Sequence, residues 1–137
     1  MTRPAPALGR AELQERLRGR GYLADRNLAT VVSIALSLQK PLLLEGEAGV
    51  GKTELAKTLA DVLGARLIRL QCYEGIDVGH ALYDWNYARQ MLHIRTIEAA
   101  DEGTDHGVGE LFGREFLVRR PLLEAIEHND PVAPVLL

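Results

Sequence analysis

A glycine-rich loop in the first half of the chain places the strongest constraint on its fold. Residues 46–53 read Gly-Glu-Ala-Gly-Val-Gly-Lys-Thr and match the pattern G-x-x-x-x-G-K-[ST] at every fixed position. Glycines let the backbone wrap closely around a phosphate, with successive N–H groups pointing inward. A helix that begins near Gly51 adds the positive end of its dipole, about half an elementary charge. The motif therefore predicts a nucleoside triphosphate held between a strand and a helix.

The residues on either side of the loop supply that structural context. The apolar run at 42–44, which lies between Pro41 and the loop, is typical of a buried parallel strand. After the loop, apolar residues recur at helical spacing until Gly64, and residues 66–71 are apolar enough for a second strand. Strand, loop, helix and strand make a right-handed βαβ unit. The expected fold class is therefore α/β, a P-loop NTPase with a parallel sheet.

The rest of the chain predicts further elements around this unit. Residues 1–20 are expected to form an N-terminal extension and a first helix, and 21–137 the P-loop domain itself. A second helix is expected to be capped by Asp25 or Asn27 and to end at 39–41. The later expectations are an irregular aromatic segment at 72–87, a helix at 88–100, an acidic glycine-containing loop at 101–113, a short helix from Pro121 to about Glu127, and a strand beginning at Val135.

Charge and composition exclude several classes of protein. A net charge of −3 over 137 residues argues against a basic nucleic-acid-binding surface. No apolar stretch approaches the roughly 18–20 residues that a membrane span needs, and the first residues lead into no secretory signal. The single cysteine, Cys72, can form no disulfide within the chain, and we expect it to be a small buried side chain. We therefore expect a cytoplasmic protein without a membrane span or a nucleic-acid partner.

The motif assigns roles to its own residues. Lys52 can reach the β- and γ-phosphates, and Thr53 can offer its hydroxyl to Mg²⁺. The backbone from Gly46 to Gly51 would cradle phosphate. The cradle consists of Gly46, Glu47, Ala48, Gly49, Val50 and Gly51. We interpret the Glu47 carboxylate as a solvated loop group rather than a substrate sensor.

Other residues that bear reactive groups carry weaker patterns. The histidines at 80, 93, 106 and 128 lie at no metal-ligand spacing. Four aromatic residues gather within 73–87, and aromatic side chains on a loop often mark a contact surface. They are equally typical of a loop that packs onto its own core, so both interpretations stay open.

Three segments together resemble a known family. The stretches 42–54, 67–75 and 82–87 resemble the MoxR-type AAA+ ATPases, and most of all the CoxD-like branch associated with maturation of molybdenum-containing carbon monoxide dehydrogenase. The resemblance runs from about Tyr22 to Leu137. The segments Gln71–Gly75 and Trp85–Tyr87 point to this branch, because the P-loop alone is shared by many families.

The resemblance implies both an architecture and an activity. It implies an AAA+ core, an αβα sandwich, in a hexameric ring that hydrolyses ATP with Mg²⁺ to remodel a client metalloenzyme. A protein with a von Willebrand factor A domain is an implied partner. Tyr22 and Leu23 would lie beside the adenine, Glu54 would complete the nucleotide site, and the loop 73–75 would face the pore and touch the client.

The resemblance departs from the family at Leu137. In the family, the strand that resembles residues 135–137 runs into an Asp-Asp/Glu pair, which holds Mg²⁺ and polarises water. Sensor residues, an arginine finger and a helical lid follow there. We therefore expect a P-loop fold truncated before its remaining strands and lid, and expect this chain alone to be incompetent in hydrolysis. Two rival functions stay open: a P-loop small-molecule kinase, and a non-catalytic module whose interactions depend on nucleotide.

Overall fold

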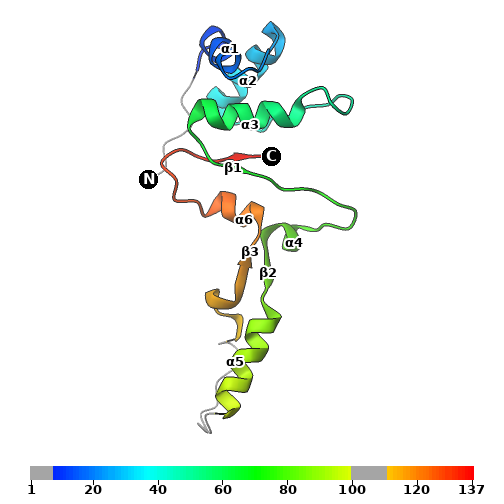
Figure 1. Ribbon diagram of the computed structural model, residues 1–137, viewed down its shortest axis with the longest axis vertical. Coiled ribbons are helices and arrows are strands. Elements are labelled where there is room, and N and C mark those ends of the chain that lie inside the picture. The colour runs from blue at the N-terminus through cyan, green and yellow to red at the C-terminus, as the bar shows by residue number, and fades with distance from the viewer. Residues whose placement is uncertain (1–7, 100–110) are drawn as a thin grey trace. The chain divides into compact units, whose positions relative to one another are not determined.

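The computed structural model describes residues 8–99 and 111–137 (Figure 1). The chain divides into two compact units. The first runs to Gln71 and takes in Glu127–Leu137, and the second is Cys72–Ile126. The P-loop belongs to the first unit.

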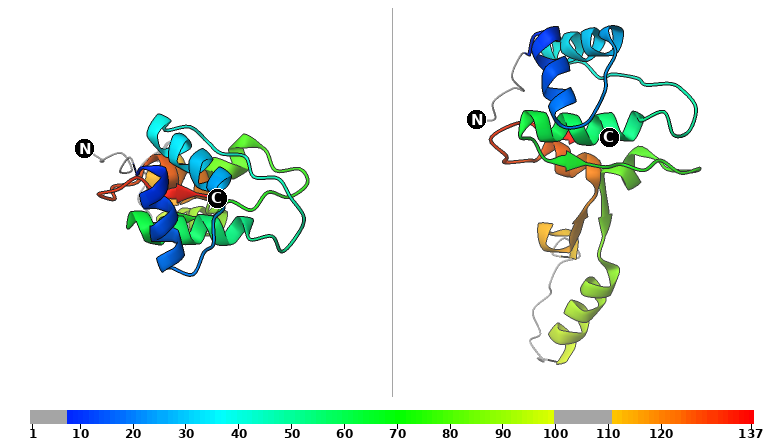
Figure 2. Two further views of the ribbon diagram at one scale, coloured as in Figure 1. Left: turned by 90° about the horizontal axis from the view of Figure 1, so that it is seen from above. Right: turned by 45° about the horizontal axis from the view of Figure 1, so that its top comes forward.

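The first unit layers helices on a small parallel sheet. Its helices are α1 (Arg10–Gly19), α2 (Arg26–Leu38) and α3 (Lys52–Leu63), and its strands are β1 (Leu67–Ile68) and β4 (Val135–Leu136). The strands pair in parallel, with Leu67 opposite Val135 and Ile68 opposite Leu136. In Figures 1 and 2, α3 lies between the α1–α2 pair and the strands. The parallel sheet and the strand that begins at Val135 are confirmed, although β1 is shorter than the predicted 66–71.

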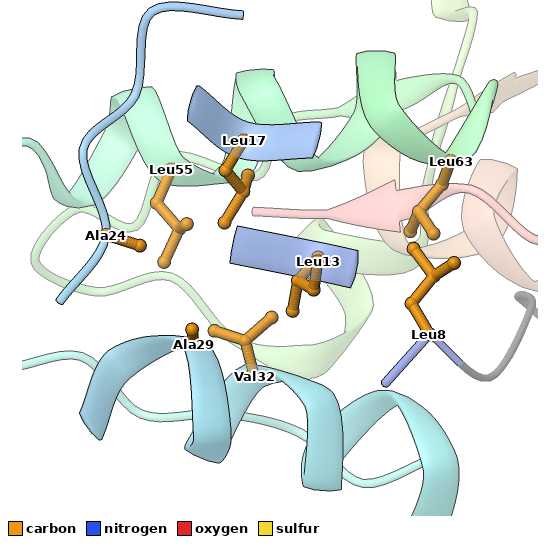
Figure 3. Close-up of a cluster of buried hydrophobic side chains, with 8 residues drawn as sticks. All are labelled: Leu8, Leu13, Leu17, Ala24, Ala29, Val32, Leu55 and Leu63. Carbon is orange, nitrogen blue, oxygen red and sulfur yellow. The ribbon is translucent and has the colours of Figure 1, made fainter. Parts of the chain in front are cut away.

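The core of this unit joins the three helices. Leu13 and Leu17 lie four residues apart on α1 and have no exposed surface. They meet Val32 of α2 and Leu55 of α3 in one apolar cluster (Figure 3). The buried members are Leu8, Leu13, Leu17, Ala24, Ala29, Val32, Leu55 and Leu63. α1 therefore shares a core with α3, the helix of the P-loop.

The expected strand at 42–44 does not form. These residues have no regular secondary structure, and Leu43 is 81% exposed. An open apolar cavity of about 650 Å³ is lined by Leu42 and Leu44, by α2 and α3, and by residues 133–137. A strand needs a neighbour to pair its backbone groups, and no strand in the described part of the chain lies beside this segment. The prediction was wrong for that reason, and the parallel pair is β1–β4.

An aspartate fixes the start of α2. Asp25 Oδ1 accepts a hydrogen bond of 2.7 Å from the backbone N–H of Leu28, which would otherwise lack a partner at the helix N-terminus. The helix ends where Gln39 takes a left-handed conformation with φ of 52°. Of the two residues predicted as caps, the structure uses Asp25 and places Asn27 inside the helix.

Asp25→Ala is expected to lower the free energy of unfolding by about 0.5–2 kcal/mol, because it leaves that N–H without its acceptor. Asn27→Ala is a matched control, because Asn27 is an exposed residue two positions away. It should change stability by less than about 0.5 kcal/mol. Urea unfolding followed by circular dichroism measures both, and equal effects would contradict the cap.

The second unit holds an antiparallel strand pair and short helices. Its elements are α4 (Val78–Leu82), β2 (Tyr83–Trp85), α5 (Tyr87–Ala99), the 3₁₀ turn η2 (Arg114–Phe116), β3 (Leu117–Arg119) and α6 (Pro121–Ile126). β2 and β3 pair with Asp84 opposite Val118. The predicted helices at 88–100 and from Pro121 are confirmed as α5 and α6. The segment 72–87 is more ordered than expected, since it contains α4 and β2. Most of the predicted loop at 101–113 lies outside the described residues.

The aromatic residues of this unit divide between packing and exposure. The Trp85 ring is half-buried and meets Tyr83 and Phe112 edge-on, with centroids 5.8 Å and 5.1 Å away. Tyr73 and Tyr87 are 61% and 66% exposed. Trp85 thus packs within its own unit, while these two tyrosines remain available for contact.

Cys72 is exposed, so its predicted burial is wrong. It follows β1 in a stretch without regular structure, where no core surrounds it.

An ion pair joins Asp84 of β2 to Arg120, the residue after β3, and lowers the pKa of the Asp84 carboxyl group. Arg120 donates a hydrogen bond of 2.9 Å to Asp84, and the Trp85 backbone N–H donates a second. These two contacts, the arginine's first, hold the pKa of Asp84 below its usual value. A lowered folded pKa stabilises the fold at pH above the unfolded carboxyl pKa. That contribution is lost as the pH falls through the folded pKa.

Arg120→Gln is therefore expected to raise the pKa of Asp84 toward its ordinary value. Carbon-detected NMR titration of the carboxyl groups measures this shift. Asp77 is the internal control, because its pKa is lowered by hydrogen bonds from His80 rather than by an arginine. An unchanged Asp84 pKa, or an equal rise at Asp77, would contradict the assignment.

Candidate nucleotide-binding site

The glycines of the P-loop take conformations that other residues rarely adopt. Gly49 and Gly51 have φ of 87° and 92°, in the left-handed region where a side chain would be strained. Gly51 is the N-cap of α3, so the loop turns directly into the helix. The positive φ that the motif requires of its glycines is therefore present at both positions.

The start of α3 is an open anion site. Gly51 O accepts a hydrogen bond of 2.9 Å from the Leu55 N–H, which closes the first helical turn. No side chain caps the N-terminus. The first N–H groups of a helix have no partners within it, and the helix dipole is positive at that end. The loop thus presents backbone donors to an anion.

Lys52 folds back across the loop. Its Nζ donates to the carbonyl oxygens of Gly46 and Glu47, at 2.7 Å and 2.6 Å. Such bonds are strengthened by the charge of the ammonium group. The only positive side chain of the motif is therefore tied to the backbone at the start of the loop.

The residues after Lys52 leave one hydroxyl accessible. Thr53 is exposed in the first turn of α3. Glu54, which follows it, forms a surface ion pair of 3.2 Å with Lys57. A threonine hydroxyl beside bound phosphate is a suitable oxygen ligand for Mg²⁺. The other motif side chains, Glu47, Ala48 and Val50, are exposed.

Tyr22 and Leu23, the two residues predicted beside the adenine, differ in their exposure and in what they lie against. Tyr22 is half-buried and lies against the P-loop: a methyl group built on Gly51 would lie 3.6 Å from its Cε2 atom and 3.7 Å from its hydroxyl. Leu23 is 81% exposed and lines a hollow with residues of α1. Burial, and then the charge of Asp25, raise the pKa of Tyr22, so the phenol stays neutral at physiological pH. The contact between Tyr22 and Gly51 was not predicted, because nothing in the sequence pattern links the two positions.

The histidines form no metal centre in the described part of the chain. No group of three His, Cys, Asp or Glu residues among residues 8–99 and 111–137 could hold a metal ion. His80 instead pairs with Asp77 at 2.8 Å. His106 lies outside the described residues. None of the described helices is long and apolar enough to cross a membrane.

Together these groups suit the phosphates of a nucleotide. The loop offers backbone N–H groups, one ammonium and one accessible hydroxyl within a short stretch of chain. Backbone donors at a helix N-terminus, together with a lysine, recognise phosphate charge. The geometry therefore agrees with the role that the motif predicts for residues 46–53.

Comparisons with known proteins identify the family of the chain. The family model described as AAA domain (dynein-related subfamily) matches residues 41–110, more than half of the 137 residues. Midasin from Giardia intestinalis is 39% identical over 51 residues, which are 37% of this chain and 1% of that protein. No solved structure matches. With its P-loop NTPase α/β fold, the chain belongs to the dynein-related subfamily of AAA domains, a family of ATPase-type domains that bind ATP with Mg²⁺.

Proposed function

We propose that the complete protein is a MoxR-type AAA+ ATPase that uses ATP to remodel or mature a metalloenzyme partner. The observation that carries the proposal is the P-loop itself: the Lys52 ammonium is hydrogen-bonded to two carbonyls of the loop, and no side chain caps the start of α3. Both features suit a triphosphate. The resemblance of residues 67–75 and 82–87 to the CoxD-like branch supports the choice of client, a molybdenum-containing carbon monoxide dehydrogenase.

Each site residue then has a defined task. The backbone from Gly46 to Gly51 would bind the phosphates, and Lys52 would exchange its loop carbonyls for β- and γ-phosphate oxygens. Thr53 would ligate Mg²⁺, which neutralises charge on those phosphates when bound. The half-buried ring of Tyr22 would border the nucleotide at Gly51. Glu54 is already engaged with Lys57, so we assign it a place at the rim of the site.

The proposed partners follow from exposed groups and from the resemblance. Tyr73 is exposed at the head of the loop that we propose touches the client. Exposed aromatic side chains provide large contact areas at a low cost in conformational entropy. By resemblance, the complete protein would form a hexameric ring in the cytoplasm and work with a von Willebrand factor A domain protein. The net charge of −3 supports a protein client rather than nucleic acid.

The test is Mg²⁺-dependent ATP hydrolysis by the complete protein, with its mass measured by light scattering with and without ATP. We expect turnover and a larger assembly when ATP is present. ATP binding without turnover, also in the presence of the proposed partners, would instead identify a nucleotide-dependent interaction module. Transfer of phosphate to a small molecule would identify a kinase.

A further inference from the structure

The connector between α1 and α2 touches the P-loop through one aromatic ring. We propose that Tyr22 is a positioning residue whose ring holds Gly51 and couples nucleotide binding to the α1–α2 helices. The inference rests on the proposed function, because it requires a nucleotide at the loop. All of the groups involved lie in the first unit.

The backbone of the connector is tied to both helices. The Tyr22 N–H donates to the Leu17 carbonyl at the end of α1, at 3.0 Å. Gln14 Nε2 of α1 donates to the Ala24 carbonyl, also at 3.0 Å. Asp25 caps α2. Residues 22–25 therefore move only if α1 and α2 adjust with them.

The ring of Tyr22 joins this connector to the loop. It packs against the same core cluster that buries Leu13 and Leu17. A methyl group built on Gly51, the N-cap of α3, would lie 3.6 Å from its Cε2 atom and 3.7 Å from its hydroxyl, so the ring borders the Cα side of this glycine. Because Gly51 has no side chain and a left-handed φ, its own conformational preference restrains it weakly. The packed ring supplies the restraint that the glycine lacks.

The position of Gly51 matters for phosphate binding. It begins the run of backbone N–H groups at the start of α3 that would bind a phosphate. Because burial and the charge of Asp25 raise its pKa, Tyr22 adds no negative charge beside this anion site. Coupling between two sites is reciprocal. If the ring stabilises the binding form of the loop, bound nucleotide must in turn stabilise the connector and its helices.

Hydrogen exchange on the 137-residue chain, with and without MgATP, tests the coupling between the nucleotide site and the α1–α2 helices directly. We expect ATP to slow exchange of amides in the loop and also in α1 and residues 21–25. Protection of the loop with no change in α1 or the connector would overturn the coupling. No protection anywhere would count against the proposed nucleotide site itself, so the two failures are distinguishable.

Substitutions at Tyr22 distinguish the contribution of the aromatic ring from that of the hydroxyl group. Tyr22→Phe keeps the ring and should retain both ATP affinity and the protection of α1. Tyr22→Ala should weaken ATP binding by about 5-fold or more, the lower range of measured couplings, and should abolish the protection of α1. Leu36→Ala is the control, because Leu36 also packs against the core cluster from α2. It should lower stability without changing affinity. Equal affinities for Tyr22→Ala and the parent chain, or equal losses in both alanine variants, would refute the positioning role.

Discussion

Replacing Lys52 with alanine is expected to weaken ATP binding by about 10- to 100-fold. A hydrogen bond to a charged group contributes about 1.5–3 kcal/mol, and each 1.4 kcal/mol changes affinity about tenfold. The Lys52 ammonium donates to the carbonyls of Gly46 and Glu47. The motif assigns this group to the β- and γ-phosphates, so alanine removes a charged donor from the site. Isothermal titration calorimetry with MgATP measures the loss.

Lys57→Ala is the matched control for this experiment. Lys57 lies one turn and a half further along α3 and pairs with Glu54 at the surface. Its removal changes the charge by the same amount but takes away no donor from the loop, so affinity should change by less than about twofold at physiological salt. If both variants lost the same affinity, general charge rather than the loop geometry would explain the binding.

Replacing Leu17 with alanine is expected to lower the free energy of unfolding by about 2–5 kcal/mol. Leu17 has no exposed surface and packs in the cluster shared with Val32 and Leu55. Its truncation removes apolar contacts and leaves a cavity between three helices. Small domains have about 5–15 kcal/mol of stability in total, so the loss should be visible as a large drop in the urea midpoint.

Leu38→Ala is the matched control for Leu17→Ala. Leu38 is the same residue type at the end of α2 but is 63% exposed, so its truncation should cost less than about 0.5 kcal/mol. If Leu17→Ala cost no more than Leu38→Ala, α1 would not be packed on the P-loop helix. That result would favour the sequence-based division of the chain after residue 20.

Local chemistry made several elements predictable from the sequence. Asp25 can accept a hydrogen bond from a helix N-terminus, and Gly64, with φ of 63°, ends α3 without a side-chain penalty. The motif at 46–53 specifies its own backbone, because glycines are needed wherever φ is positive. The residues predicted for the cradle, Lys52 and Thr53 accordingly lie together in one loop and one helical turn. All of these features depend on residues only a few positions apart.

Features that depend on distant partners were decided by the tertiary structure. Residues 42–44 have the composition of a strand, but no strand among residues 8–99 and 111–137 pairs with them. β2 and β3 are three residues each, too short for an alternating pattern, and they form because residues more than thirty positions apart meet. Tyr22 and Gly51 are likewise distant in the sequence and lie near each other only in the folded chain. The sequence by itself determined the phosphate loop, the helices α1, α2, α3, α5 and α6, and the cap of α2, because these need only neighbouring residues. The tertiary structure decided which strands pair and what packs on the loop, because both require contacts between distant segments that no local pattern records.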